Sequence, residues 1–275
     1  MAEPHSKEKK EEEIEERTAP AGEVVYRAIH SEGEHELKRD SRSLAWSGLA
    51  AGLSMGFSMI CEALLRTHLP EADWAPLVSK FGYSVGFLIV ILGRQQLFTK
   101  NTLTVILPLL RERRAAIFRN VARLWAIVLL TNLVGVFLAA WLLGSTSIID
   151  PEVHATLATL GREAMGHSFG GTLLRAILAG WFIALMVWLL PFAETGRVAV
   201  IIILAYFIGL AHLPHIVAGS GKVFFLVVTG GVPFWDAIGA FVIPTLIGNV
   251  LGGVSLVAAL AHAEFVAGES GENLK

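Results

Sequence analysis

The sequence predicts an all-α integral membrane protein with six transmembrane helices, in two halves of three that form an inverted repeat. The chain is 54% hydrophobic and 17% charged, which is too apolar for the surface of a soluble domain of 275 residues. Polar residues interrupt two of its apolar segments. Thr99 and His215, one in each interruption, are 116 positions apart, and Asn132 and Asn249, which follow them, are 117 apart. Paired broken helices at equal spacing indicate a channel or transporter whose pathway passes the breaks.

Six apolar segments are long enough for a hydrocarbon core of roughly 30 Å. They cover residues 44–65, 81–110, 119–143, 172–192, 198–228 and 237–262, and the second and fifth are the broken ones. In the first segment, Gly48, Gly52 and Gly56 recur at every fourth position and leave one helix face open for close packing. We expect residues 44–262 to form one membrane channel domain.

The remaining segments are polar, and the distribution of basic residues predicts the orientation. Residues 1–22 are expected to be a disordered charged tail, 23–43 a surface helix, and 263–275 a second tail. Arginine and lysine residues gather before the first span and in the second and fourth connections: Lys38, Arg39, Arg42, Arg111, Arg113, Arg114, Arg119 and Arg197. The opposite loops contain only Arg66, Lys80 and Arg162. Both termini are therefore predicted to be cytoplasmic.

His215 is the strongest candidate for a functional side chain, because an ionisable residue inside a span is costly. A histidine can give or take one proton near neutral pH while a weak acid passes, or it can be a neutral residue bonded to a carbonyl that the break frees. Thr99 and Asn101 either orient the substrate or satisfy backbone groups of the break. Asn132 and Asn249 are expected to anchor the broken loops by hydrogen bonds.

The charged residues of the apolar segments allow more than one interpretation. Arg94 either faces a water-filled vestibule or pairs with an acid such as Glu62, and Lys222 is equally ambiguous. Glu62 and Arg66, at i and i+4, predict a local ion pair.

No cofactor is predicted. His212 and His215 have an H-x-x-H spacing without the glutamate of a zinc-protease helix, so no metal site or haem is expected, and His212 is explained by a backbone bond at the kink of Pro214. The sequence contains no constellation of catalytic residues and no basic, aromatic-rich patch. These observations exclude an enzyme and a nucleic-acid partner.

Several motifs resemble the formate/nitrite transporter family between about residues 40 and 262. They are LFTKNT after a broken second span, NLVG and GNVLGG, and HIVAGS in a broken fifth span. AAGLSMG, GRQQLFT and HIVAGS together are similar to a divergent branch of that family. The resemblance implies an aquaporin-like protomer in a homopentamer of the inner (plasma) membrane, surrounded by lipid. Its small-molecule substrate would be a small monovalent anion or the neutral weak acid.

The resemblance also implies roles for individual residues. His215 matches the central histidine and Thr99 the threonine that faces it. Residues at positions of the two apolar slits are Leu97, Phe98, Tyr83, Phe87 and Ile208. The lysine that the family places before the fourth span falls near Ala164, so Arg94, Arg162 and Lys222 are the cations that could supply charge selection. A pore for a neutral solute or an ammonia-type substrate is the alternative, favoured if Arg94 is buried in an ion pair and no cation faces the vestibules.

Overall fold

The structure is a computed structural model that describes residues 22–258 and residue 262. Every regular element within these residues is a helix. The α-helices are α2 (Gly22–Lys38), α3 (Ser41–His68), α4 (Ala75–Ser79), α5 (Ser84–Leu92), α6 (Phe98–Thr104), α7 (Ile106–Glu112), α8 (Ala115–Ser145), α9 (Pro151–Ala164), α10 (Phe169–Leu189), α11 (Arg197–Leu210), α12 (Ala218–Val228), α13 (Phe234–Ala237) and α14 (Ile243–Leu251). The 3₁₀-helical turn Lys80–Tyr83 joins α4 to α5, and π-helical segments flank α14 at Ile238–Val242 and Gly252–Ala258.

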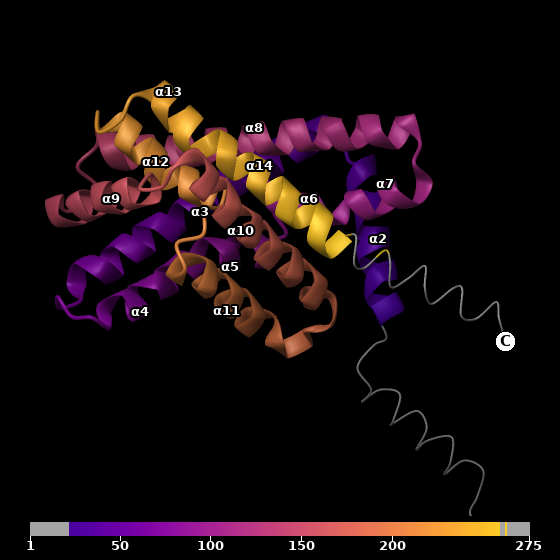
Figure 1. The fold of residues 1–275 in the computed structure, drawn as a ribbon, viewed down its shortest axis with the longest axis horizontal. Helices are drawn as coiled ribbons and strands as arrows, with labels where there is room; N and C mark the ends of the chain where they lie inside the picture. The colour runs from indigo at the N-terminus through magenta and orange to yellow at the C-terminus, as the bar shows by residue number, and fades with distance from the viewer. Residues whose placement is uncertain (1–21, 259–261, 263–275) are drawn as a thin grey trace, which may run out of the picture.

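Five stretches of the described chain are long and apolar enough to cross a membrane. They are Ser41–His68, Ala75–Leu92, Ala115–Ser145, Phe169–Phe192 and Phe234–Ser255. The sixth segment expected from the sequence, 198–228, occurs as α11 and α12, neither of which has the length of a span. Most of the long helices run roughly along or oblique to the long axis of the molecule, whereas α2 runs across it (Figure 1). Helices α2 and α7 lie at one end and α4, α9 and α13 at the other. We refer to these as the α2 end and the α9 end.

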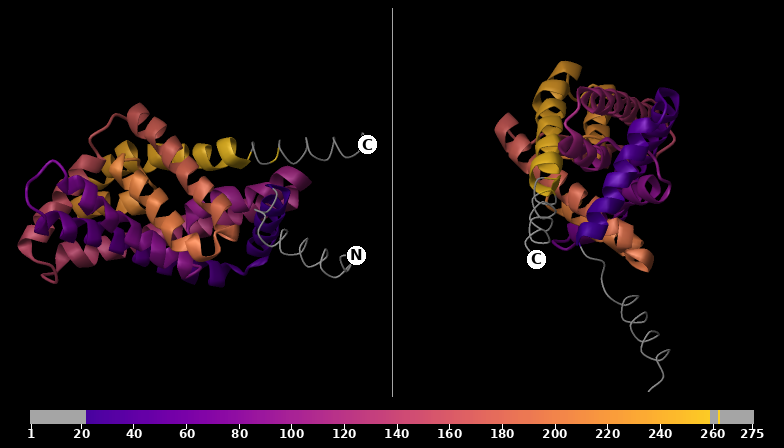
Figure 2. Two further views of the ribbon diagram at one scale, coloured as in Figure 1. Left: turned by 90° about the horizontal axis from the view of Figure 1, so that it is seen from below. Right: turned by 90° about the vertical axis from the view of Figure 1, so that its right-hand side faces the viewer.

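Two parts of the fold differ from the sequence expectation. The segment 23–43, expected as one surface helix, contains α2 and the start of α3, separated by a corner at which Asp40 caps α3. Helix α2 buries Tyr26 and Ile29 and packs against α6 and α7 (Figure 2). The region 144–171, expected to be a loop, contains α9. That helix buries Val153, Leu157 and Leu160 against α3 and α12, because these residues recur on one helical face.

Glycines bring two helix pairs into close contact, α3 with α8 and α10 with α14. A Cβ atom built on Gly52 of α3 would lie 2.2 Å from the carbonyl oxygen of Asn132. A Cβ atom on Gly180 of α10 would lie 2.4 Å from the carbonyl oxygen of Asn249. Only glycine permits this approach, so the two asparagines lie at the same kind of close helix contact.

We expect Gly52→Ala to lower the thermal stability of the purified protein, because the new methyl group would contact backbone that cannot move aside. The cost of such overpacking is about 1–3 kcal/mol. Gly170→Ala is the matched control, since nothing lies within 4 Å of a Cβ atom at Gly170. Equal melting temperatures for the two variants would contradict this account of the packing.

Candidate functional site

The chain leaves helical geometry at two places, between α5 and α6 and between α11 and α12, and the same backbone hydrogen bonds recur at both. After α5, three N–H groups donate to carbonyl oxygens at 2.9–3.1 Å: Gly93 to Ile89, Arg94 to Ile91 and Gln95 to Val90. After α11, the bonds are 3.0–3.2 Å long: Ala211 to Phe207, His212 to Gly209 and Leu213 to Ile208. Each residue of the second set lies 118 positions after its counterpart. In this register His215 corresponds to Leu97, so Thr99 and His215 are not equivalent positions of the repeat.

Arg94 and His212 occupy the same position in the two breaks and share an unusual backbone. Both have φ of 50°, in the left-handed region that favours glycine. For other residues this conformation costs about 1–2 kcal/mol. Because this unfavourable backbone conformation occurs at both equivalent positions, we infer that the side chains of Arg94 and His212 have a function there.

Asn132 and Asn249 each hold one break by three buried hydrogen bonds. The Asn132 side chain accepts from the N–H of Phe98 at 2.9 Å and donates to the carbonyls of Gln96 at 2.8 Å and Gly48 at 2.7 Å. Asn249 repeats this pattern on the second break. Its partners are the N–H of Ile216 at 2.8 Å, the carbonyl of Pro214 at 3.0 Å and the carbonyl of Ala176 at 2.8 Å.

Thr99 and His215 meet between the two breaks, and both are fully buried. The Thr99 hydroxyl oxygen lies 2.8 Å from Nε2 of His215. The N–H groups of Val217 and Ala218 donate to Nδ1 at 3.3 and 3.2 Å, so Nδ1 carries no proton. The proton of the neutral ring is therefore on Nε2, which donates to Thr99. The hydroxyl proton of Thr99 is therefore available for a hydrogen bond to a different acceptor.

Apolar side chains surround this pair. The rings of Phe87 and His215 meet edge to face with centroids 5.0 Å apart, and Tyr83 packs against Phe87 at 5.5 Å. Ile208 and Leu97 are also buried. Phe98 is buried on α6 and packs against Trp125 of α8.

Asn101 contacts the break and not the histidine. Its amide nitrogen donates to the side-chain oxygen of Gln96 at 2.9 Å, and its side-chain oxygen accepts from Thr104 at 3.3 Å.

A small cavity of about 40 Å³ opens toward the α9 end, and we call it the α9-side cavity. It reaches His215, and its other lining residues include Tyr83, Ile208, His212, Lys80, Lys222 and Glu163. The α9-side cavity is therefore lined by Lys222 and by three residues that the resemblance assigned to the pathway: Tyr83, Ile208 and His215.

The charges of this cavity form a buried cluster of two lysines and one glutamate. Lys80 and Lys222 each donate to the carboxylate of Glu62 at 2.5 Å, one to each oxygen. Glu62 is fully buried, and the side chains of Lys80 and Lys222 are 4% and 10% exposed. With both lysines protonated, the cluster has a net charge of +1.

The expected Glu62–Arg66 pair was wrong. Arg66 instead binds Glu163 of α9 at 2.8 Å. The reason is that Lys80 and Lys222 occupy both oxygens of Glu62, while Arg66, one turn later on α3, lies beside α9.

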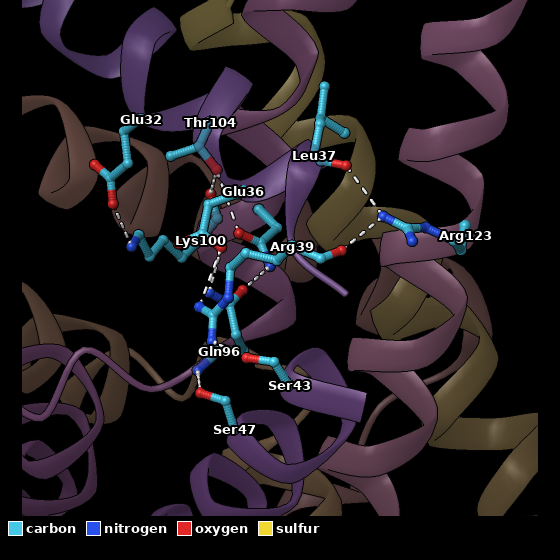
Figure 3. A network of polar contacts seen from close by, with 11 residues as sticks. Glu32, Glu36, Leu37, Arg39, Ser43, Ser47, Gln96, Lys100, Thr104 and Arg123 are labelled. Carbon is cyan, nitrogen blue, oxygen red and sulfur yellow. Dashed lines mark hydrogen bonds and ion pairs between the residues drawn. The ribbon is translucent and has the colours of Figure 1, made fainter. Parts of the chain in front are cut away.

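A larger cavity of about 590 Å³ opens toward the α2 end, and we call it the α2-side cavity. Arg94, exposed to solvent, and the buried Leu97 both line it. A polar network connects α2 to α6 at its rim: Glu32 binds Lys100 at 2.6 Å, and Glu36 binds Gln96 at 2.7 Å and Arg39 at 3.2 Å (Figure 3).

Arg162 lines neither cavity. It is exposed on α9 and donates to the Thr159 hydroxyl at 3.1 Å. Sequence reasoning missed Lys80 and Lys222 as the partners of Glu62. The available signal was the presence of opposite charges in two apolar segments, which must pair when buried.

The chain belongs to the formate/nitrite transporter family, whose sequence pattern matches residues 23–263. It is 37% identical over 256 residues to the inner membrane protein YfdC of Escherichia coli, an alignment that covers 93% of this chain and 83% of that protein. YfdC typifies the divergent branch that the sequence motifs indicated. The formate channel BtFdhC of Bacillus thuringiensis is 26% identical over 216 residues, covering 75% of this chain and 80% of the relative.

Two solved structures share the fold. A pentameric formate channel with formate bound gives a TM-score of 0.70 at 19% identity, with 82% of this chain and 97% of that chain covered. An FNT family ion channel gives a TM-score of 0.72 at 18% identity, covering 88% and 98%. At these identities the likeness establishes the fold.

Asn132→Ala should strongly destabilise the protein, because it leaves the N–H of Phe98 and the carbonyl of Gln96 without their partner and removes the bond to the carbonyl of Gly48 on α3. Each buried group left unsatisfied costs about 1–3 kcal/mol. Thermal unfolding of the purified variant measures the loss, with Asn120→Ala as the control on the same helix. A melting temperature equal to that of the control would show that these bonds do not hold the break.

Proposed function

We propose that the protein is a transmembrane channel for a small monovalent anion of the formate/nitrite class or its neutral weak acid. In this proposal, α3, α8, α10 and the α13–α14 segment are four of six spans. The broken spans two and five are α4–α7 and α11–α12, and the two halves are an inverted repeat in an aquaporin-like protomer. The recurrence of the break hydrogen bonds 118 positions later supports this. The pentamer of the solved formate channel supports a homopentamer.

The observation that carries the proposal is the position of the Thr99–His215 pair between two cavities. The α9-side cavity ends at His215, and the α2-side cavity ends at Leu97, two residues from Thr99. Phe87 and Phe98 belong to the buried apolar layer between them. A solute that crosses the protomer by this route passes the fully buried pair between the two cavities. Asn101 contributes to this pathway indirectly, because its side chain binds Gln96 in the loop between α5 and α6.

The chemistry of the pair suits a weak acid. A bare anion meets a large desolvation barrier in an apolar constriction, whereas the neutral acid meets a much smaller one. A proton taken up from the aqueous phase first converts His215 to the imidazolium. The ring can then donate the Nε2 proton to Thr99 while the Thr99 hydroxyl proton passes to the anion, and the ring returns to its neutral form. This relay protonates the solute at the place where its charge is most costly.

The positive charges favour an anion over the alternative of a neutral-solute pore. Arg94 is exposed in the α2-side cavity, and the described residues contain no carboxylate partner for it. The Lys80–Glu62–Lys222 cluster adds a net positive charge at the α9-side cavity. Arg162, outside both cavities, contributes at most to the long-range field.

The basic residues also support an orientation with both termini in the cytoplasm. The connection from α7 to α8 contains Arg113 and Arg114, and Arg197 starts α11. In this proposal the α2 end faces the cytoplasmic side of the inner membrane.

His215→Asn tests the proton step. The amide can still accept a backbone bond, so we expect a folded protein whose formate flux no longer rises as external pH falls. Flux into proteoliposomes at several pH values, with and without a proton gradient, measures this. His68→Asn, an exposed position of α3, is the control. Identical pH profiles for wild type and His215→Asn would remove the histidine from the mechanism.

Charge selection is tested by a pair of variants. Lys222→Gln leaves the buried cluster neutral, whereas Lys222→Arg keeps its net charge at +1 and can still pair with Glu62. We expect Lys222→Gln to lower anion flux by about tenfold at low salt, with less effect at high salt, while Lys222→Arg retains flux. Equal flux per folded protein in both would mean that the cluster is structural only.

A further inference from the structure

The α2-side cavity is much larger than a small anion requires. It measures about 590 Å³, against about 40 Å³ for the α9-side cavity that also leads to the Thr99–His215 pair. Pockets of roughly 300–1,000 Å³ are typical of sites for organic ligands. One part of its lining is apolar and comes from the end of α5, the start of α6 and one face of α10: Ile91, Leu92, Leu97, Ile183, Met186 and Val187.

The rim of this cavity has an excess of positive charge. Its two carboxylates are already engaged, Glu32 with Lys100 at 2.6 Å and Glu36 with Arg39 at 3.2 Å (Figure 3). Arg94 and Arg197 also line the cavity, and neither has a carboxylate partner in the part of the chain that the structure describes. Arg197 makes only a 3.5 Å contact with the carbonyl of Pro191.

The backbone of Arg94 supports a role in binding. Its φ of 50° is the conformation in which glycine or asparagine is ordinarily found. The hydrogen bonds of Gly93, Arg94 and Gln95 to the end of α5 fix this conformation. The backbone of Arg94 is strained, and its exposed side chain lines the cavity together with apolar residues. Its guanidinium is therefore available to bind an anionic group.

We propose that the α2-side cavity binds a water-soluble organic anion. Its carboxylate or sulfonate group would contact Arg94 and Arg197, and its apolar body would lie against Leu92, Ile183 and Met186. Leu97 at the end of the cavity is 1% exposed, so a ligand of this size stops there and obstructs the cytoplasmic mouth of the proposed pathway. Binding itself does not depend on which solute the protein transports.

Alkyl sulfonates test this proposal, because they remain charged and do not cross membranes as neutral acids. Binding of hexanesulfonate, methanesulfonate, hexanol and sulfate to the full-length protein is measured by calorimetry in nanodiscs of zwitterionic lipid. We expect hexanesulfonate to bind, with affinity rising up to about fourfold per added methylene in the series from methanesulfonate. Hexanol and sulfate should bind at least about tenfold more weakly.

Two variants and a control locate the site. Arg94→Asn tolerates the left-handed backbone, and it and Arg197→Gln should each weaken hexanesulfonate binding by about tenfold. Arg119→Gln, an exposed position of α8 outside the cavity lining, should bind like the wild type.

Four results would overturn the proposal. Unchanged affinity in Arg94→Asn and Arg197→Gln would place binding elsewhere. Equal binding of hexanol would show apolar partition only, and equal binding of sulfate would show an ionic contact only. Loss of hexanesulfonate binding in nanodiscs of anionic lipid, with no loss in zwitterionic ones, would assign the cavity to a lipid headgroup.

Discussion

The structure depends on two buried asparagines that satisfy the backbone where the chain stops being helical. A break in an apolar segment frees N–H and C=O groups that neither water nor lipid can satisfy at that depth. Asn132 and Asn249 each accept one bond from such a group and donate another, and each donates a third bond to a carbonyl of the neighbouring helix. Each also lies where a glycine of the neighbouring helix approaches within van der Waals contact. Helix packing and loop anchoring are therefore parts of one arrangement.

This arrangement determines where the chemistry can occur. Anchoring Phe98 and Ile216 fixes the starts of α6 and α12, and those starts carry Thr99 and His215 to hydrogen-bond distance. The first N–H groups of α12 donate to Nδ1 of the histidine and so determine its tautomer. Both ring nitrogens of His215 therefore have hydrogen-bond partners, which hold the ring in one orientation.

Sequence reasoning predicted the local features better than the long-range ones. Polar residues in apolar runs located the ends of α5 and α11, and the equal spacing indicated a repeat. The break hydrogen bonds recur 118 positions later, two more than the spacing of Thr99 and His215, because these two residues are not equivalent positions of the breaks. Glu62 could not be matched to Lys80 and Lys222, 18 and 160 positions away, without knowing how α3, the turn Lys80–Tyr83 and α12 pack. Helix α9 was missed because only three apolar residues on its buried face distinguish it from a polar loop.

The central claim is that a weak acid crosses in its protonated form at the Thr99–His215 pair. Simultaneous recording of formate and proton uptake by wild-type proteoliposomes, at several imposed membrane potentials, tests it most directly. The account predicts one proton for each formate and a flux that does not depend on the potential. Formate uptake that follows the potential, without accompanying protons, would contradict it.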